Sequence, residues 1–240
     1  MNRDLIVERI LDFSDKYKLD YSMKYNKKQL KQNPLHALDF FFGRVFYGGI
    51  WDSVCTRERN IAFNYIKQIG FDIILEKILN RNFTPQKVFI NNLKKRGVSN
   101  SRRGKMVYDI LNWLATIENH NCVTYSIKEI KNKKISSLFY FFIDEIYFIG
   151  EKKASFFLRD LVDFFKLHEF LDKEEYIYVL PIDTYINKFL LELKLKKTKK
   201  IAWKNDARII LNWCEEVNIS PILLDQGVWY AYANNYKIFD

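Results

Sequence analysis

Apolar residues recur at three- and four-residue spacing along most of this 240-residue chain. That spacing places them on one face of an α-helix, whereas a half-buried strand needs strict alternation. The chain has only eight glycines and four prolines, which is few for the many turns of an all-β protein of this size. With 48% hydrophobic residues, it can bury a sizeable core in one large domain or two small lobes. We therefore expect an all-α fold.

Prolines and capping residues mark the expected helix boundaries. Thr84 and Ser220 each stand before a proline, an order typical of an N-cap followed by the first helical residue. The whole pattern predicts helices at residues 4–18, 35–47, 57–69, 71–81, 85–95, 104–118, 136–146, 151–166, 183–195, 203–218 and 221–234, a short helix or loop at 126–134, a linker at about 168–180 and a polar connector before Pro34.

The charge balance favours a polyanionic partner. The chain has 39 Lys and Arg residues against 29 Asp and Glu, for a formal net charge of +10. Such a charge promotes binding to nucleic acids through counterion release and electrostatic steering. Solubility alone also explains many basic chains, so a specific function has to be argued from motifs.

The cysteines and the N-terminus exclude several classes of protein. Cys55, Cys122 and Cys214 lie too far apart in sequence to predict a disulfide framework, a zinc site or an iron–sulfur cluster. The N-terminus is charged and amphipathic rather than a signal peptide, and no run approaches the length of a membrane span. We expect an intracellular, cytoplasmic protein without a membrane segment or a bound metal.

A tight hairpin is expected between the two apolar helices that cover residues 136–166. Its turn contains Ile149 and Gly150, and its exit helix begins just before Lys152. Amides exposed in such a turn and at a helix N-terminus can face a phosphate, and the helix dipole adds a favourable potential. The pattern resembles the helix–hairpin–helix that binds the DNA backbone, although Phe148 stands where that motif has a second glycine. An ordinary αα-hairpin is the alternative.

The hairpin lysine is followed by an acid at the start of another helix. Lys152 lies two residues after Gly150, and Asp183 lies two residues after Pro181. With the segment Gly-Glu-Lys-Lys-Ala-Ser-Phe-Phe-Leu-Arg, this pair resembles the lysine-bearing branch of the helix–hairpin–helix DNA glycosylases. The 31-residue gap between the two residues and the Asp-Gln-Gly-Val-Trp segment at 225–229 are most similar to the archaeal type of 8-oxoguanine DNA glycosylase/lyase. The resemblance covers roughly residues 98–234.

The resemblance implies a two-lobed helical fold without an iron–sulfur cluster. Residues 1–70 together with 183–240 would form one lobe, and residues 71–182 the other, with the DNA cleft between them. Lys152 and Asp183 would face each other across that cleft.

The resemblance also implies a reaction. Lys152 would form a Schiff base with the deoxyribose and then permit β-elimination, while Asp183 would stabilise the cationic sugar. An aspartate at a helix start is also an ordinary N-cap, and the two roles are compatible. The implied partner is double-stranded DNA that contains an oxidised base, 8-oxoguanine first, and we expect the protein to be a monomer. No cofactor is implied, although hairpins of this type can hold a monovalent cation through their carbonyls.

The base pocket and the DNA-contacting surface have further candidates. The resemblance assigns Asp225 and Trp229 to the base pocket, whereas composition alone favours a core position for Trp229. Trp51 is a candidate for the opposite face of the base. The candidates for DNA contact lie in the hairpin and at the predicted start of the helix at 104–118, and they are Ile149, Gly150, Lys153, Arg102, Arg103 and Lys105.

Two other functions remain open from the sequence. The first is a glycosylase of the same fold that acts on another damaged base, such as an oxidised pyrimidine. The second is a non-catalytic module that uses the hairpin only to contact the DNA backbone. A binding module has no need for Lys152 or Asp183, so these two residues separate the alternatives.

Overall fold

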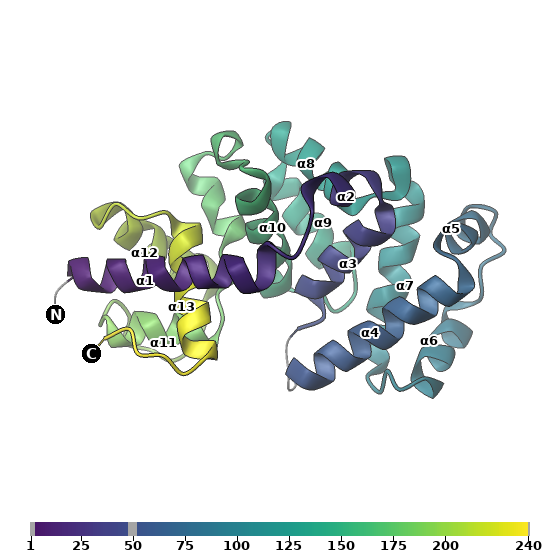
Figure 1. Cartoon of the computed structure of the whole chain (residues 1–240), viewed down its shortest axis with the longest axis horizontal. Coiled ribbons are helices and arrows are strands. Elements are labelled where there is room, and N and C mark those ends of the chain that lie inside the picture. Colours follow the sequence, from purple (N-terminus) through teal and green to yellow (C-terminus); the bar gives the residue numbers. More distant parts are fainter. Residues whose placement is uncertain (1–2, 48–51, 240) are drawn as a thin grey trace.

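The computed structural model describes residues 3–47 and 52–239, and within these ranges it contains helices and loops but no strand (Figure 1). This confirms the all-α class. The α-helices are α1 (Arg3–Tyr17), α2 (Lys27–Gln32), α3 (Pro34–Val45), α4 (Asp52–Ile69), α5 (Phe71–Leu79), α6 (Gln86–Lys95), α7 (Ser101–Thr116), α8 (Cys122–Lys131), α9 (Ile135–Glu145), α10 (Glu151–Phe165), α11 (Thr184–Glu192), α12 (Trp203–Glu216) and α13 (Pro221–Ala233). A π-helical turn, Lys18–Ser22, follows α1, and 3-10 turns span Glu118–His120, His168–Phe170 and Lys173–Val179.

Asparagine N-caps explain two of the differences between the observed and the expected helices. Asn26 accepts the amides of Lys28 and Gln29 and starts α2 inside the stretch that was expected to be a connector. Asn121 caps α8, which therefore begins four residues before the expected position of 126. Since asparagine is also common in turns, its capping role becomes clear only with the backbone geometry.

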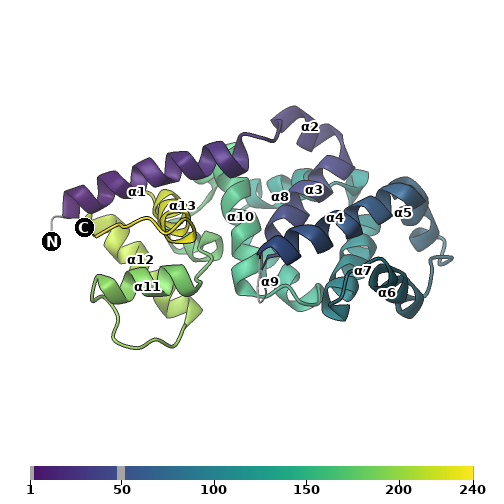
Figure 2. The same ribbon diagram turned by 60° about the horizontal axis from the view of Figure 1, so that its bottom comes forward.

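Two clusters of buried apolar side chains make up the core. The larger cluster is built mainly from α3 to α10, and the aromatic rings of Phe41, Phe142 and Phe157 pack against one another in it. The smaller cluster joins α1 to α11, α12 and α13 (Figure 2). Residues 30–46 and 62–66 contribute to the larger cluster and not to the smaller one, so the clusters divide the chain differently from the expected lobes.

Helices α1 and α13 pack in close contact although they come from opposite ends of the chain (Figures 1 and 2). Gly227 permits this contact, because a Cβ there would lie 2.1 Å from the carbonyl oxygen of Ile10. The contact places Trp229, two residues further along α13, beside the end of α1. None of the described helices combines the length and the apolar character that crossing a bilayer requires.

Candidate active site

The turn between α9 and α10 has one residue in the left-handed region. Phe148, which replaces the second glycine of the motif, has a φ of 68°, an unfavourable conformation for a side chain of this size. Lys153 stabilises the turn, since its Nζ donates a hydrogen bond to the Phe148 carbonyl at 3.0 Å and lies 3.8 Å from the centre of the Phe148 ring. The turn thus tolerates phenylalanine with the help of a neighbouring lysine amine.

Gly150 leaves the start of α10 open to the outside. A Cβ at this residue would meet no atom within 4 Å, and no side chain caps the helix. The amides of Lys153 and Ala154 donate to the Gly150 carbonyl, so the intrahelical bonding begins there. Neither packing nor backbone conformation within the described chain requires a glycine, and the residue leaves room for a ligand to approach the helix N-terminus.

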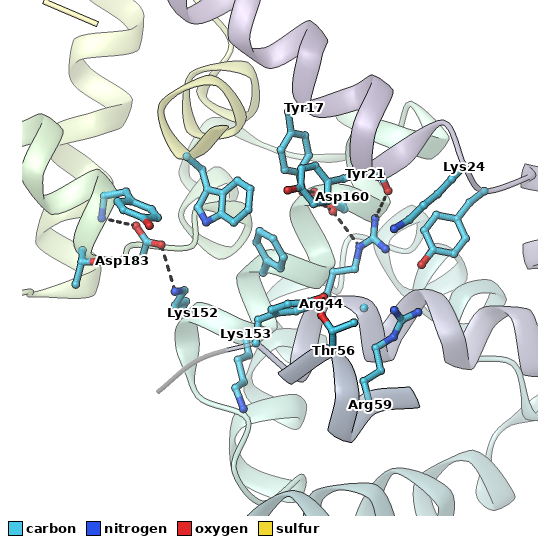
Figure 3. A pocket seen from close by; sticks show the side chains of 17 residues that line it. Tyr17, Tyr21, Lys24, Arg44, Thr56, Arg59, Lys152, Lys153, Asp160 and Asp183 are labelled. Atoms are coloured by element: carbon cyan, nitrogen blue, oxygen red, sulfur yellow. Dashed lines mark hydrogen bonds and ion pairs between the residues drawn. The ribbon is translucent and has the colours of Figure 1, made fainter. Parts of the chain in front are cut away.

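Lys152 and Asp183, which the sequence places 31 residues apart, meet in the folded chain. The Lys152 Nζ lies 3.2 Å from Asp183 Oδ2, and the Lys152 side chain is 44% exposed whereas that of Asp183 is 4% exposed (Figure 3). The other carboxylate oxygen, Oδ1, accepts the amides of Tyr185 and Ile186 at 2.8 and 3.1 Å. Asp183 therefore caps α11 and pairs with the lysine at the same time.

The ion pair stands at the wall of a cavity of about 400 Å³ (Figure 3). Side chains from α1, the following turn, α3, α4, α10, α11 and α13 line it. Its aromatic walls include Tyr17, Tyr21, Phe156, Tyr185 and Trp229, and its cations are Lys24, Arg44, Arg59, Lys152 and Lys153. Flat rings with several positive charges suit an aromatic, negatively charged ligand such as a nucleotide. Sequence analysis did not place the N-terminal lining residues, because no local pattern links them to residues more than 100 positions away.

Trp229 lines this cavity, as the resemblance implies, but Asp225 does not. The indole of Trp229 packs edge-on against Tyr17 and Tyr21, with ring centres 5.8 and 5.5 Å apart. Asp225 is only 1% exposed and forms a buried ion pair with Arg159. Burial raises the pKa of Asp225 to about 7, against the opposing effect of Arg159. The expected base contact by Asp225 is therefore wrong for this structure, where the carboxylate serves a buried charge network instead.

That network connects helices on both sides of the cavity. Asp160 on α10 accepts hydrogen bonds from Arg44 Nε and Arg159 Nε, both at 2.9 Å, and from the Tyr17 hydroxyl at 2.8 Å. Arg159 in turn pairs with Asp225 on α13. Helices α1, α3, α10 and α13 are thereby held in one arrangement around the cavity. The adjacent Arg159 and Asp160, which follow an apolar stretch of α10, are the local sequence signal for this network.

The candidates for DNA contact on α7 separate into exposed and buried residues. Arg102 is exposed, and Lys105 is partly exposed and pairs with Asp109 at 2.6 Å. Asp109 also accepts the amide of Tyr147, which places the start of α7 against the hairpin turn. Arg103 is 0% exposed and pairs with Glu58 at 3.2 Å, so the expected DNA contact by this residue is wrong. Its helical position directs it inward, away from Arg102.

The hairpin candidates differ in the same way. Gly150 is exposed, whereas Ile149 is buried and its amide donates to the Ile146 carbonyl within the turn. Lys153 is 8% exposed, and its side chain points away from Lys152 and Asp183 (Figure 3). Burial, followed by repulsion from Arg103, lowers the pKa of Lys153 to about 7. Ile149 is thus part of the turn, and the Lys153 amine bonds to the turn although the residue also lines the cavity. The candidate Trp51 lies outside the described residues.

No group of three or more His, Cys, Asp and Glu side chains in the described ranges is arranged to hold a metal ion. Comparison with protein-family models, with curated proteins and with solved structures finds no match for this chain. The candidate site therefore stands on its own residues: a lysine–aspartate pair, an aromatic and basic cavity, and an open helix N-terminus beside them.

Proposed function

We propose that this protein is a DNA glycosylase with AP lyase activity, of the helix–hairpin–helix type, that removes oxidised guanine from double-stranded DNA. The observation that carries the proposal is the contact of 3.2 Å between Lys152 Nζ and Asp183 Oδ2 beside a cavity of about 400 Å³. A module that only binds the DNA backbone needs neither the pair nor the cavity. We further propose that it acts inside the cell as a monomer, and 8-oxoguanine is the first substrate to test.

The cavity has the properties that an everted nucleotide requires. A base turned out of the duplex loses its stacking partners, and aromatic side chains can replace them. Trp229 and Phe156 supply rings near Lys152, with their centres 6.1 Å apart. The sugar of such a nucleotide would then lie at the opening of the cavity beside Lys152, where the Lys152 amine is exposed.

The ion pair supplies two complementary groups for the reaction. After the Lys152 amine loses a proton, its lone pair attacks C1′ of the sugar while the bond from C1′ to the base nitrogen breaks and the base leaves with a proton. The sugar becomes cationic in the transition state, and the Asp183 carboxylate stabilises that charge. Two amides and the N-terminus of α11 keep the carboxylate in position. Opening of the sugar ring gives an imine, and removal of a C2′ proton then expels the 3′ phosphate.

The surface around this opening suits the phosphates of a duplex. The open N-terminus of α10 lies beside the turn that contacts α7, where Arg102 and Lys105 are located. Amides at helix ends and nearby cations position a DNA backbone without reading its sequence. The net charge of +10 strengthens this attraction over longer distances.

The decisive experiment uses duplexes that each contain one defined lesion. Base release and strand nicking are separated by adding or omitting alkali, and borohydride is used to trap the imine. We expect the wild-type protein to release 8-oxoguanine and to cross-link, and Lys152→Ala to do neither. Lys166→Ala is the matched control, since Lys166 is an exposed lysine at the other end of α10.

Two outcomes would contradict the proposal. Cross-linking by Lys152→Ala would remove this residue as the nucleophile. Duplex binding that depends steeply on salt, without base release from any lesion, would instead favour the binding module.

A further inference from the structure

The side of the cavity away from Lys152 and Asp183 has its own chemical character. Figure 3 shows Lys24 and Arg59 there, brought together from the segment before α2 and from α4. Tyr25 and Gly43 line the same end. None of these residues belongs to the hairpin or to the ion pair that supports the proposed reaction.

Gly43 keeps this end of the cavity open. It lies inside α3, where glycine is less favourable than alanine. A Cβ at Gly43 would lie 3.3 Å from the Tyr25 hydroxyl and 3.8 Å from the guanidinium of Arg59. The missing side chain therefore leaves space directly beside these two polar groups.

The groups around that space are hydrogen-bond donors. The Lys24 ammonium lies 5.9 and 5.4 Å from the ring centres of Tyr21 and Tyr25, and its acidic neighbours, Asp39 and Asp160, pair with Arg59 and Arg44. Arg59 pairs with Asp39, while its buried Nε has no hydrogen-bond partner among the described residues.

The protonation of these groups follows from their surroundings. Burial lowers the pKa of Lys24, and repulsion by the Arg44 and Arg59 guanidinium groups lowers it further. Burial raises the pKa of Tyr25, so its hydroxyl keeps the proton that it can donate.

We propose that Lys24, Tyr25 and Arg59 read the edge of the everted base and select bases that present carbonyl oxygens there. The inference rests on the proposed function, which puts the sugar at Lys152 and so directs the base toward this end. Oxidised guanine presents carbonyl oxygens at C6 and C8, to which Lys, Arg and Tyr side chains can donate, whereas adenine and cytosine present an amino group in place of the C6 carbonyl of guanine. A donor-lined end therefore favours the edge of an oxidised guanine that presents O6 and O8 over the edge of adenine or cytosine that presents an amino group.

Two assays on the same variants separate base reading from the rest of the site. The first measures single-turnover base release from a duplex that contains 8-oxoguanine, and the second measures borohydride trapping on a duplex with a preformed abasic site. The variants are Lys24→Met, which removes an exposed ammonium, and Gly43→Ala, which adds a methyl group to the cavity wall. Lys28→Met is the control, because Lys28 is exposed in the adjoining helix α2 but does not line the cavity.

We expect both test variants to slow base release by about tenfold or more, since each disturbs hydrogen bonds made by charged or buried donors. Trapping on abasic DNA should stay within about twofold of wild type, because an abasic site has no base to read. Lys28→Met should match wild type in both assays.

Three results would overturn the inference. A parallel loss in both assays would mean that Lys24 contacts a phosphate, and undiminished base release would mean that this end contacts no base. A wild-type protein that neither releases 8-oxoguanine nor traps abasic DNA would overturn the proposed function, and this inference with it.

Discussion

One oxygen of the Asp183 carboxylate caps α11, and the other faces Lys152. A single substitution can therefore separate the structural role from the proposed chemical role. Asp183→Asn keeps an oxygen for the cap of α11 but removes the negative charge that faces Lys152. We expect its free energy of unfolding to stay within about 0.5 kcal/mol of wild type, because Asn and Asp cap helices equally well. Base excision should fall by roughly two orders of magnitude, while binding to the lesion duplex is retained.

Urea unfolding and single-turnover base release measure these two effects. Asp183→Ala is the comparison, because it loses the cap as well and should be destabilised by about 1 kcal/mol. Undiminished excision by Asp183→Asn would leave this residue with a capping role alone.

The lowered pKa of Lys153 makes the free energy of unfolding of the protein depend on pH. This pKa falls from 10.5 to about 7 because burial removes the ammonium from water and Arg103 repels it. Between these values the unfolded chain binds more protons than the folded one, so this residue makes the protein more stable as the pH rises from 7 to 10. Below about pH 7 the penalty for charging Lys153 is present in full.

Lys153→Met should therefore gain stability relative to wild type as the pH falls, by up to about 1 kcal/mol per pH unit between pH 10 and 7. Denaturant unfolding at several pH values measures the difference. A difference that does not change with pH would contradict the shift.

At the scale of helices, two glycines differ in the space that a side chain would have: a Cβ would clash at Gly227 and would meet no atom at Gly150. Gly227→Ala should force α1 away from α13, because the new Cβ would lie 2.1 Å from the Ile10 carbonyl oxygen. We expect a loss of about 3 kcal/mol or more, which is in the range of severe overpacking. Gly150→Ala is the control: its Cβ meets no atom within 4 Å, and its stability should change by less than about 1 kcal/mol.

Thermal and urea unfolding of the two variants compare these expectations directly. Equal stability of Gly227→Ala and wild type would mean that α1 and α13 are not in close contact. Since this contact positions Trp229, we also expect Gly227→Ala to lose base excision.

At the scale of the whole molecule, the cavity lies where the two apolar clusters meet, and the charge network of Asp160 joins them. Asp160→Asn would leave the buried Arg44 and Arg159 without the carboxylate that they share. We expect a loss of roughly 3–5 kcal/mol, as is typical when one partner of a buried ion pair is removed. Urea unfolding followed by tryptophan fluorescence measures it, and a change below about 1 kcal/mol would mean that the network is not needed to hold the clusters together.

Local interactions explain why the helices were predictable. Apolar periodicity and the Ser220-Pro221 boundary act within one or two turns, and they placed most helices within a few residues of the observed bounds. The caps made by Asn26 and Asn121 were missed, because asparagine favours turns and helix starts alike.

The sequence by itself determined the helical class through its apolar periodicity, and it placed Gly150, Lys152 and Asp183 near helix starts, because near neighbours set those helix ends. The contact between Lys152 and Asp183, which lie 31 positions apart, is a property of the tertiary structure. Only the tertiary structure decided which charges are buried. Arg103 turns inward to Glu58, 45 positions earlier in the chain, and Asp225 pairs with Arg159, 66 positions earlier. The same holds for the cavity, whose far end brings Lys24 and Arg59 together on the side away from Lys152. Burial and charge pairing depend on partners that are distant in sequence, and no local pattern specifies them.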